Sequence, residues 1–405
     1  TLQMANSLLK ETDRELRKTI FEKVNEVRLS GTAELDQLFT ELIRLRDKIA
    51  KQADYKNYRD YKLDALGRFD YTAEDCFTFH KAIEAECVPL INRMNEDRKE
   101  KLGVEVLKPF DGDVDPEGKP GLKPFKDETD LINRSIECFR RIRPFYGECL
   151  ETMDAMGHLD LGSRLGKAPG GFNYPLYEIG VPFIFMNSVG SVRDLITMVH
   201  EGGHAVHSFL SKDLEITAFK NLPSEVAELA SMSMELLSFD QWDVFFDNDE
   251  DLKRAKKEHL AKVIGVLPWT ATIDSFQHWL YENPNHTIEE RTDNWLRISG
   301  QLSSNVVDWT GYEEARKYQW QKQLHLYEVP FYYIEYAISQ LGAIAVWRNY
   351  RKDPQKALDQ YEAALKLGYT KPIGEIYATA GIDFNFSQDY VRELMQFVWE
   401  EYSKL

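Results

Sequence analysis

Apolar residues recur every three or four positions along most of the chain, which is the spacing of one buried face on a helix. From Leu8 to Val24 and from Leu35 to Ile49 they stand among Lys, Arg and Glu residues, and Gly31 separates the two stretches. The same spacing returns after Ser191 and continues almost to Leu405. The pattern therefore predicts a mainly α protein that begins with two amphipathic helices.

Two further helices are predicted in the first half of the chain. Thr72 is a suitable N-cap residue with Asp75 three positions later, and we expect it to open a long helix that runs toward Lys101. Another helix is expected from about Glu128 to Met156, after a loop at Pro109–Pro124 that is rich in Pro, Gly and Asp. In the second half, helix breaks are expected near Pro223, Pro268, Pro284, Pro330, Pro354 and Pro372.

The segment between His158 and Gly190 differs from the rest because glycines interrupt it repeatedly. Within it, Val181–Met186 is a short apolar run of the kind that forms a β-strand, and Pro182 favours an edge strand over a central one. We therefore expect one small β element in the middle of an otherwise helical fold.

The overall composition narrows the class of protein. The chain has 405 residues, which is room for two or three packed units, and 43% of them are hydrophobic, as in a folded domain. Its net charge of −17 would repel phosphates, so we expect no nucleic-acid partner. No apolar stretch is long enough for a membrane span and no secretory signal is visible at Thr1–Met4, so we expect a cytoplasmic protein without a membrane partner. The sparse cysteines form no CxxC pair and suit reduced thiols: Cys76, Cys87, Cys138 and Cys149.

The candidate chemistry is concentrated in the sequence His200-Glu201-Gly202-Gly203-His204. Two histidines four positions apart lie on one face of a helix, where both imidazoles can bind one metal ion. Glu201 borders the same face and suits a carboxylate that takes a proton from a metal-bound water. The plain alternative is a surface helix with two unrelated histidines. Gly202 and Gly203 argue against it, because glycine destabilises a helix interior and suggests that another element approaches closely.

A catalytic zinc ion normally takes three protein ligands, so a third must come from another segment. The segment that follows Pro223 carries helix-start signals and three acidic residues, Glu225, Glu228 and Glu235. Glu228 and Glu235 share a helix face, and a carboxylate among apolar neighbours is costly to bury unless it is paired or binds a metal. The alternative for these residues is a solvated acidic stripe.

Together these motifs resemble the thimet oligopeptidase and oligoendopeptidase F family of zinc metallopeptidases, and most closely its bacterial oligoendopeptidase F and Pz-peptidase branch. Further matching blocks are Gly166–Phe172, Pro182–Asn187, Asp274–Trp279 and His325–Tyr336, and the resemblance spans most of the chain from about Leu9. The resemblance implies a zincin-like helical fold with a deep substrate cleft, and one Zn²⁺ ion per chain held by His200, His204 and Glu228. It also implies Glu201 as the general base and Glu235 as a residue that orients a ligand histidine.

The same resemblance places a histidine and two tyrosines at the scissile bond, where their protons can stabilise an oxyanion. We assign His325 and Tyr336 to these positions, with Tyr333 as the second tyrosine. A helix that follows Pro330 would put Tyr333, or Tyr332, on one face with Tyr336. Without the metal motif, ordinary aromatic packing would explain this block.

The remaining candidates receive simpler interpretations. His207 is expected to support a ligand or to contact another helix. Asp274 and His278 are expected to form a local buried hydrogen bond rather than a second metal site. The Gly166–Gly171 run is expected to be a flexible substrate loop, and Lys253–Lys257 a solvated helix face. Four histidines have no evident partner in the sequence: His80, His158, His259 and His286.

The metal motif together with this resemblance predicts a zinc-dependent endopeptidase. The resemblance implies helices around a deep cleft, so internal bonds of short peptides would be cut and folded proteins excluded. An extended peptide is expected to pair with the predicted edge strand at Phe183–Asn187. Two alternatives stay open: an exopeptidase with the same zinc chemistry, and a non-catalytic scaffold that binds peptides. An intact Glu201 argues against the scaffold, because binding alone does not need a base.

Within this interpretation, residues 1–157 form a helical portion of the catalytic unit and residues 158–405 form the zinc-binding portion. Relatives of this type carry a further N-terminal lobe that helps to wall the cleft. A chain that opens on Thr1, already inside a family-like helix, is therefore expected to be a fragment without that lobe, and the lobe would then be a partner.

Overall fold

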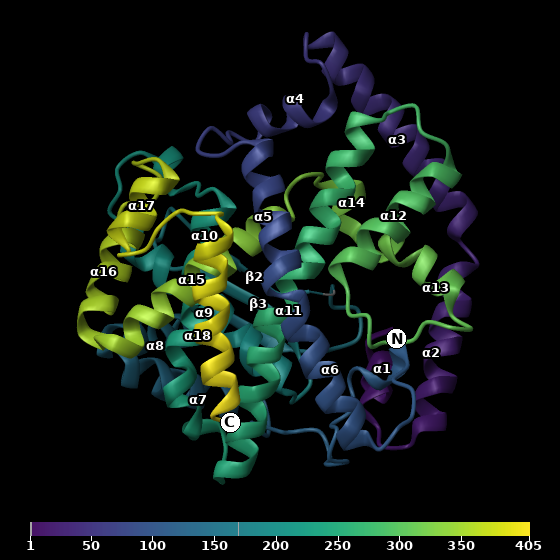
Figure 1. The fold of residues 1–405 in the computed structure, drawn as a ribbon. Coiled ribbons are helices and arrows are strands. Elements are labelled where there is room, and N and C mark those ends of the chain that lie inside the picture. Colours follow the sequence, from purple (N-terminus) through teal and green to yellow (C-terminus); the bar gives the residue numbers. More distant parts are fainter. Residues whose placement is uncertain (1, 169) are drawn as a thin grey trace. The chain divides into compact units, whose positions relative to one another are not determined.

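The computed structural model describes residues 2–168 and 170–405. Pro169, which belongs to one of the blocks quoted above, lies outside the described residues. Helices dominate the fold and the strands form one small sheet (Figure 1), so the predicted mainly α class with a small β element is confirmed. The chain divides into two compact units, which are described separately below.

The first unit takes the chain up to Gly121, together with Ile264–Ile334 and Phe386–Met395. Its core is aromatic, since the ring of Phe39 lies 4.9 Å from that of Trp320 and the ring of Phe276 lies 5.7 Å from the same indole. Its helices are α1 (Leu2–Ser7), α2 (Arg14–Leu29), α3 (Thr32–Gln52), α4 (Tyr58–Ala65), α5 (Ala73–Glu86), α6 (Val88–Leu102), the last part of α11 (Asp249–Glu282), α12 (Ile288–Leu302), α13 (Glu313–Lys317), α14 (Leu324–Glu328) and the first part of α18 (Gln388–Ser403).

The second unit takes Leu122–Val263, Glu335–Asn385 and Gln396–Leu405. It contains the sheet and the helices that carry the candidate metal ligands. Its helices are α7 (Glu128–Ile142), α8 (Pro144–Ala155), α9 (Val192–Ser211), α10 (Ser224–Leu237), the first part of α11, α15 (Ile334–Lys352), α16 (Pro354–Lys366), α17 (Ile373–Thr379) and the last part of α18. Short 3₁₀ turns in the two units span Leu8–Lys10, Pro109–Asp111, Thr217–Lys220, Ser238–Phe245 and Gln319–Lys322.

The sheet has the strand order β1-β3-β2, with β1 at Leu159–Gly162, β2 at Phe172–Tyr174 and β3 at Phe183–Ser188. β3 pairs in parallel with β1 and antiparallel with β2, so both of its edges are occupied. The prediction that this run is an edge strand is therefore wrong. The physical reason is that Pro182 lies just before the first residue of β3, where its missing N–H removes no ladder hydrogen bond.

The N-terminal helices follow the predicted pattern with one correction. α2 begins at Arg14 rather than near Leu8, because the Asp13 side chain accepts hydrogen bonds from two backbone amides of the first turn. Leu8 precedes it in a 3₁₀ turn. The predicted separation at Gly31 is confirmed, since α3 begins at the next residue.

Two long predicted helices are each divided in two. The capping box of Thr72 and Asp75 is confirmed, but α5 ends at Glu86, and α6 follows with Pro89 in its first turn. In the same way Arg143 is extended, with φ −153° and ψ 136°, and separates α7 from α8. The residue before a proline is pushed out of the helical region, and Pro144 follows Arg143.

Pro268 does the opposite of what was predicted. It lies inside α11, a helix of 34 residues that continues past this proline to Glu282. An internal proline costs about 3 kcal/mol, and burial of the helix offsets this cost, since Leu267 and Ala271 are both fully buried. Although α11 is long, neither it nor any other helix in the described part of the chain has an apolar stretch that could cross a membrane.

Candidate metal centre

The helix that carries the His-Glu-x-x-His motif, α9, begins with a capping box. The amide of Ser191 donates to Asp194 Oδ2 at 2.8 Å, and the amide of Asp194 donates to Ser191 Oγ at 3.4 Å. The apolar side of the helix is anchored by residues such as Leu195, which is fully buried. One turn apart on the other side, the rings of His200 and His204 have centroids 5.0 Å apart and nearly perpendicular planes.

The two glycines of the motif let other helices approach α9 very closely. A Cβ atom at Gly203 would lie 2.7 Å from the Cα of Ser231 in α10, and one at Gly202 would lie 2.5 Å from the ring of Phe139 in α7. Real Cβ atoms do not come this close to other atoms. The predicted close approach of another element is therefore confirmed, and it is α10 that packs backbone to backbone against Gly203.

This packing brings the three predicted ligands together. The carboxylate Oε2 of Glu228 lies 3.3 Å from His200 Nε2 and 3.9 Å from His204 Nε2, and one donor atom from each residue falls within 4.8 Å of the others. Ser231 Oγ donates a hydrogen bond to the same carboxylate at 3.2 Å and holds it in place. Glu225, one turn earlier on α10, does not belong to this group.

Glu235 supports the group from the next turns of α10. His200 Nδ1 donates to Glu235 Oε1 at 2.6 Å, which leaves Nε2 of the same ring for the cluster. The other oxygen of Glu235 lies 3.3 Å from Nε2 of His259, a buried residue of α11. A partner for His259 cannot be predicted from the sequence, because Glu235 is distant along the chain and no local spacing connects the two residues.

The charges of the cluster favour a cation. Burial alone would lower the pKa of the His200 imidazole, but Glu228 and Glu235 raise it well above its usual range. Burial would likewise raise the pKa of Glu228, but His200 and His204 lower it to about 2. Burial lowers the pKa of His204 to about 4, so this ring is neutral at pH 7 and has a lone pair to offer.

Glu201 lies beside the cluster without belonging to it. Its side chain is buried, and its Oε2 atom has no hydrogen-bond partner among the described residues. Burial raises the pKa of this carboxyl to about 7, and the neighbouring His200 acts in the opposite direction. The backbone oxygen of Glu201 accepts a 3.5 Å hydrogen bond from Asn173 Nδ2, so the edge strand β2 lies next to this turn of α9.

The predicted oxyanion residues fall into two groups. In the first unit, His325 lies in α14, its ring centroid is 4.9 Å from that of Tyr333, and Trp269 Nε1 donates to Tyr333 Oη at 3.1 Å. Tyr336 lies in α15 of the second unit. The expected helix over all the tyrosines is wrong, because α15 begins only at Ile334. The face-sharing argument for Tyr333 and Tyr336 therefore fails, and their roles stay predictions.

Other histidines have partners that the sequence did not reveal. His80 Nε2 lies 2.9 Å from Asp274 Oδ2, and His158 Nδ1 lies 3.0 Å from the carbonyl oxygen of Pro182. His207 is buried one turn beyond His204, and burial lowers its pKa to about 3, so it is neutral. Its predicted support of a ligand stays a prediction.

Comparison with known proteins identifies the family of the chain. Residues 7–120 and 148–396 match peptidase family M3. The chain belongs to peptidase family M3. It resembles oligopeptidase PepF of Bacillus subtilis, with 23% identity over 402 residues that cover 93% of this chain, and a plasmid-encoded oligoendopeptidase F of Lactococcus lactis, with 22% identity over 95% of it. The chain spans 55% and 63% of the length of these two relatives.

Solved structures of the same family share the fold. Pz peptidase A with an inhibitor matches the whole chain at 30% identity and a TM-score of 0.93, over 72% of its own length. A structure described as an oligoendopeptidase F from Bacillus anthracis matches the whole chain at 26% identity and a TM-score of 0.86, over 70% of its length. The resemblance inferred from the motifs is therefore confirmed.

The donor set fits the metal cofactor that membership of this metallopeptidase family implies. Two imidazoles and one carboxylate converge from two helices, within distances that one ion can bridge. His200 is fixed by Glu235 and Glu228 by Ser231, so two of the three donors have the supporting hydrogen bonds typical of metal ligands.

The contact between Glu235 and His200 leads to a first prediction. We expect Glu235→Ala to weaken metal binding by about 10–100-fold, because the His200 ring loses the acceptor that fixes its orientation. Glu235→Gln keeps an acceptor oxygen and should lose less. Competition with a chromogenic chelator measures the Kd, and Glu225→Gln on the same helix is the matched control. An unchanged Kd in Glu235→Ala would show that the 2.6 Å contact does not support a ligand.

Proposed function

We propose that the chain is a zinc-dependent endopeptidase that hydrolyses internal bonds of short peptides. The observation that carries this proposal is the convergence of His200, His204 and Glu228 within 4.8 Å, with the buried carboxylate of Glu201 beside them. Peptidase relatives support the reaction class, and the three side chains support a metal of the zinc type.

In this proposal His200, His204 and Glu228 would hold zinc. Three protein ligands are typical of catalytic rather than structural zinc, because a fourth position is left for the reaction. When bound, zinc supplies Lewis acidity, which makes a water molecule acidic near neutral pH. Glu235 keeps the His200 ring in the orientation that presents Nε2.

Glu201 is the proposed general base. Its position next to His200 puts the carboxylate near the ligands, and its Oε2 atom has no competing partner in the described part of the chain. It takes a proton from the attacking water and delivers that proton to the leaving nitrogen of the cleaved bond. His325 and Tyr336, with Tyr333 as a further candidate, are proposed to donate hydrogen bonds to the developing oxyanion.

The sheet suggests how an extended peptide binds. β3 cannot take a peptide, since both of its edges are paired, but β2 pairs only with β3 among the described residues. β2 also lies next to α9, because Asn173 bonds the backbone of Glu201. We propose that the substrate pairs with the open edge of β2 by main-chain hydrogen bonds, which would tolerate many side chains.

The test is cleavage of internally quenched peptides of graded length that are blocked at both ends. We expect internal cleavage of the short peptides, loss of the activity in a strong chelator and its return when zinc is added back. Release of single residues from unblocked peptides, with the blocked ones intact, would identify an exopeptidase. Binding without cleavage in the zinc-loaded protein would identify a scaffold, and rapid cleavage of a folded protein would contradict the restriction to short peptides.

A further inference from the structure

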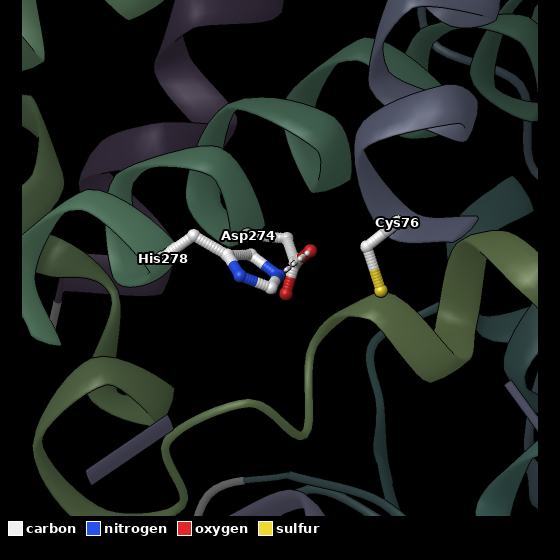
Figure 2. A group of neighbouring side chains, drawn as sticks. All are labelled: Cys76, Asp274 and His278. Atoms are coloured by element: carbon white, nitrogen blue, oxygen red, sulfur yellow. Dashed lines mark ion pairs between the residues drawn. The ribbon is translucent and has the colours of Figure 1, made fainter. Parts of the chain in front are cut away.

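A second cluster of metal-binding side chains lies in the first unit, far along the sequence from the His-Glu-x-x-His motif. Cys76 and His80 lie one turn apart on α5, and Asp274 and His278 lie one turn apart on α11. One donor atom each from Cys76, Asp274 and His278 falls within 4.8 Å of the others. Figure 2 shows Asp274 and His278 against each other, with Cys76 to one side of them. Two helices thus present two four-residue spacings to the same point.

All four side chains are withdrawn from water. Asp274 is completely buried, Cys76 and His278 are each 2% exposed, and His80 is 8% exposed. A buried carboxylate is costly unless it is paired or binds a cation. Here the pairing is incomplete: His80 Nε2 is 2.9 Å from Asp274 Oδ2, but Asp274 Oδ1 has no hydrogen-bond partner among the described residues.

His278 is also left without hydrogen bonds. Its Nε2 lies 3.2 Å from Asp274 Oδ2 without the geometry of a hydrogen bond, and neither ring nitrogen has a hydrogen-bond partner in the described part of the chain. The ring is packed between Phe77 and Phe331, with centroids 4.8 Å and 5.3 Å away, and these rings offer no acceptor. The contact between Asp274 and His278 that the sequence predicts is present as a 3.2 Å ion pair, but it leaves Asp274 Oδ1 and His278 Nδ1 without partners among the described residues.

We propose that Cys76, Asp274 and His278 bind a second divalent metal ion of the zinc class, and that His80 positions the Asp274 carboxylate. Thiolate, imidazole and carboxylate are all zinc ligands, and the thiolate favours zinc over magnesium or calcium. Zinc bond lengths of about 2.0–2.3 Å put neighbouring donors about 3.3–3.8 Å apart, close to the 3.2 Å between His278 and Asp274. On binding, the Cys76 sulfur exchanges its proton for the metal, and the proton goes to solvent.

The proposed ion would link α5 to α11 inside the first unit and would stabilise the folded state of that unit. The Cys76 side chain is buried, so a thiolate at this position needs a cation beside it. Among the described residues, Cys76 is the only one of the four cysteines that belongs to a group of metal-ligating side chains. The site would raise the zinc content from the one ion per chain expected from the sequence to two.

The thiolate makes the second site distinguishable from the first. The full chain is stripped with a chelator and titrated with Co²⁺, and bound metal is counted by mass spectrometry. We expect two equivalents in the wild type, with the near-ultraviolet charge-transfer absorption of a cobalt–thiolate bond. The double variant His200→Ala/His204→Ala should keep one equivalent and this absorption, whereas Cys76→Ser should lose the absorption and one equivalent.

The controls separate loss of metal from loss of fold. Cys87→Ser changes another buried thiol, at the end of α5, and should keep both equivalents and the absorption. Asp274→Asn keeps the shape of a ligand but not its charge, and should weaken cobalt binding at this site by at least tenfold with an unchanged circular dichroism spectrum. A wild type without the thiolate absorption, together with a His200→Ala/His204→Ala variant that binds no metal, would overturn the second site and leave the first intact.

Discussion

Replacing Glu201 with Gln should lower kcat by about 100- to 10,000-fold while zinc stays bound. A general base contributes about this factor to a hydrolysis, and at 1.36 kcal/mol per tenfold it corresponds to about 3–5 kcal/mol of transition-state stabilisation. The amide has the size of the carboxylate but cannot take a proton from water. Because Glu201 is not one of the three converging donors, the Kd for zinc should change little.

The contrast with Glu228→Gln makes this prediction specific. Glu228 lies 3.3 Å from His200 Nε2, so its amide variant should lose zinc and activity together. Metal content and quenched-peptide turnover, measured on both variants, therefore separate the base from the ligand. Full turnover in Glu201→Gln would remove the base from the proposal, and loss of its zinc would place Glu201 among the ligands instead.

The helices could be predicted from the sequence because the residues that start and end a helix are close together along the chain. The prolines show the limit of such local prediction. Pro144 ends one helix and starts another, as the residue before it is pushed into an extended conformation. Pro268 stays inside α11, because its neighbours are buried on the packed side of the helix. The same residue type has opposite outcomes, and only tertiary packing decides between them.

The sheet shows the same limit for strands. The run at β3 was recognised from its composition, but its place in the sheet depends on β1 and β2, which are separated from it along the chain. The apolar run at Val181–Met186 includes Pro182, but β3 begins only at the next residue, Phe183. An error of one or two residues at the strand start therefore turned a central strand into a predicted edge strand.

The candidate site was predictable where its geometry follows from one helix. His200 and His204 meet because they are four positions apart, whereas only the family resemblance distinguishes Glu228 from Glu225 and Glu235 as a ligand. Contacts between helices cannot be predicted from local spacing, so the sequence does not indicate that His259 lies beside Glu235. The pairing of His80 with Asp274 also joins two helices, so the sequence does not predict it. Only the spacing of four residues within each helix is visible there, between Cys76 and His80 and between Asp274 and His278.

Gly203→Ala should destabilise the second unit and weaken the metal site at the same time. The added Cβ would lie 2.7 Å from Ser231 Cα and 3.0 Å from the Ala230 carbonyl oxygen, and backbone atoms cannot move aside without shifting α10. Overpacking of this kind costs about 1–3 kcal/mol, more than the 0.5–1 kcal/mol or so that alanine adds to a helix interior. Because α9 carries His204 and α10 carries Glu228, any separation of the helices also pulls the ligands apart.

Two other glycines calibrate that result. At Gly202 the added Cβ would meet the ring of Phe139, a side chain that can shift, so Gly202→Ala should cost less than Gly203→Ala. At Gly265, inside α11, nothing lies within 4 Å of the added atom, so Gly265→Ala should raise stability by about 0.5–1 kcal/mol. Thermal unfolding in chelator and the zinc Kd measure both effects. If Gly203→Ala matches Gly265→Ala in both, the backbone contact between α9 and α10 does not hold the metal ligands together.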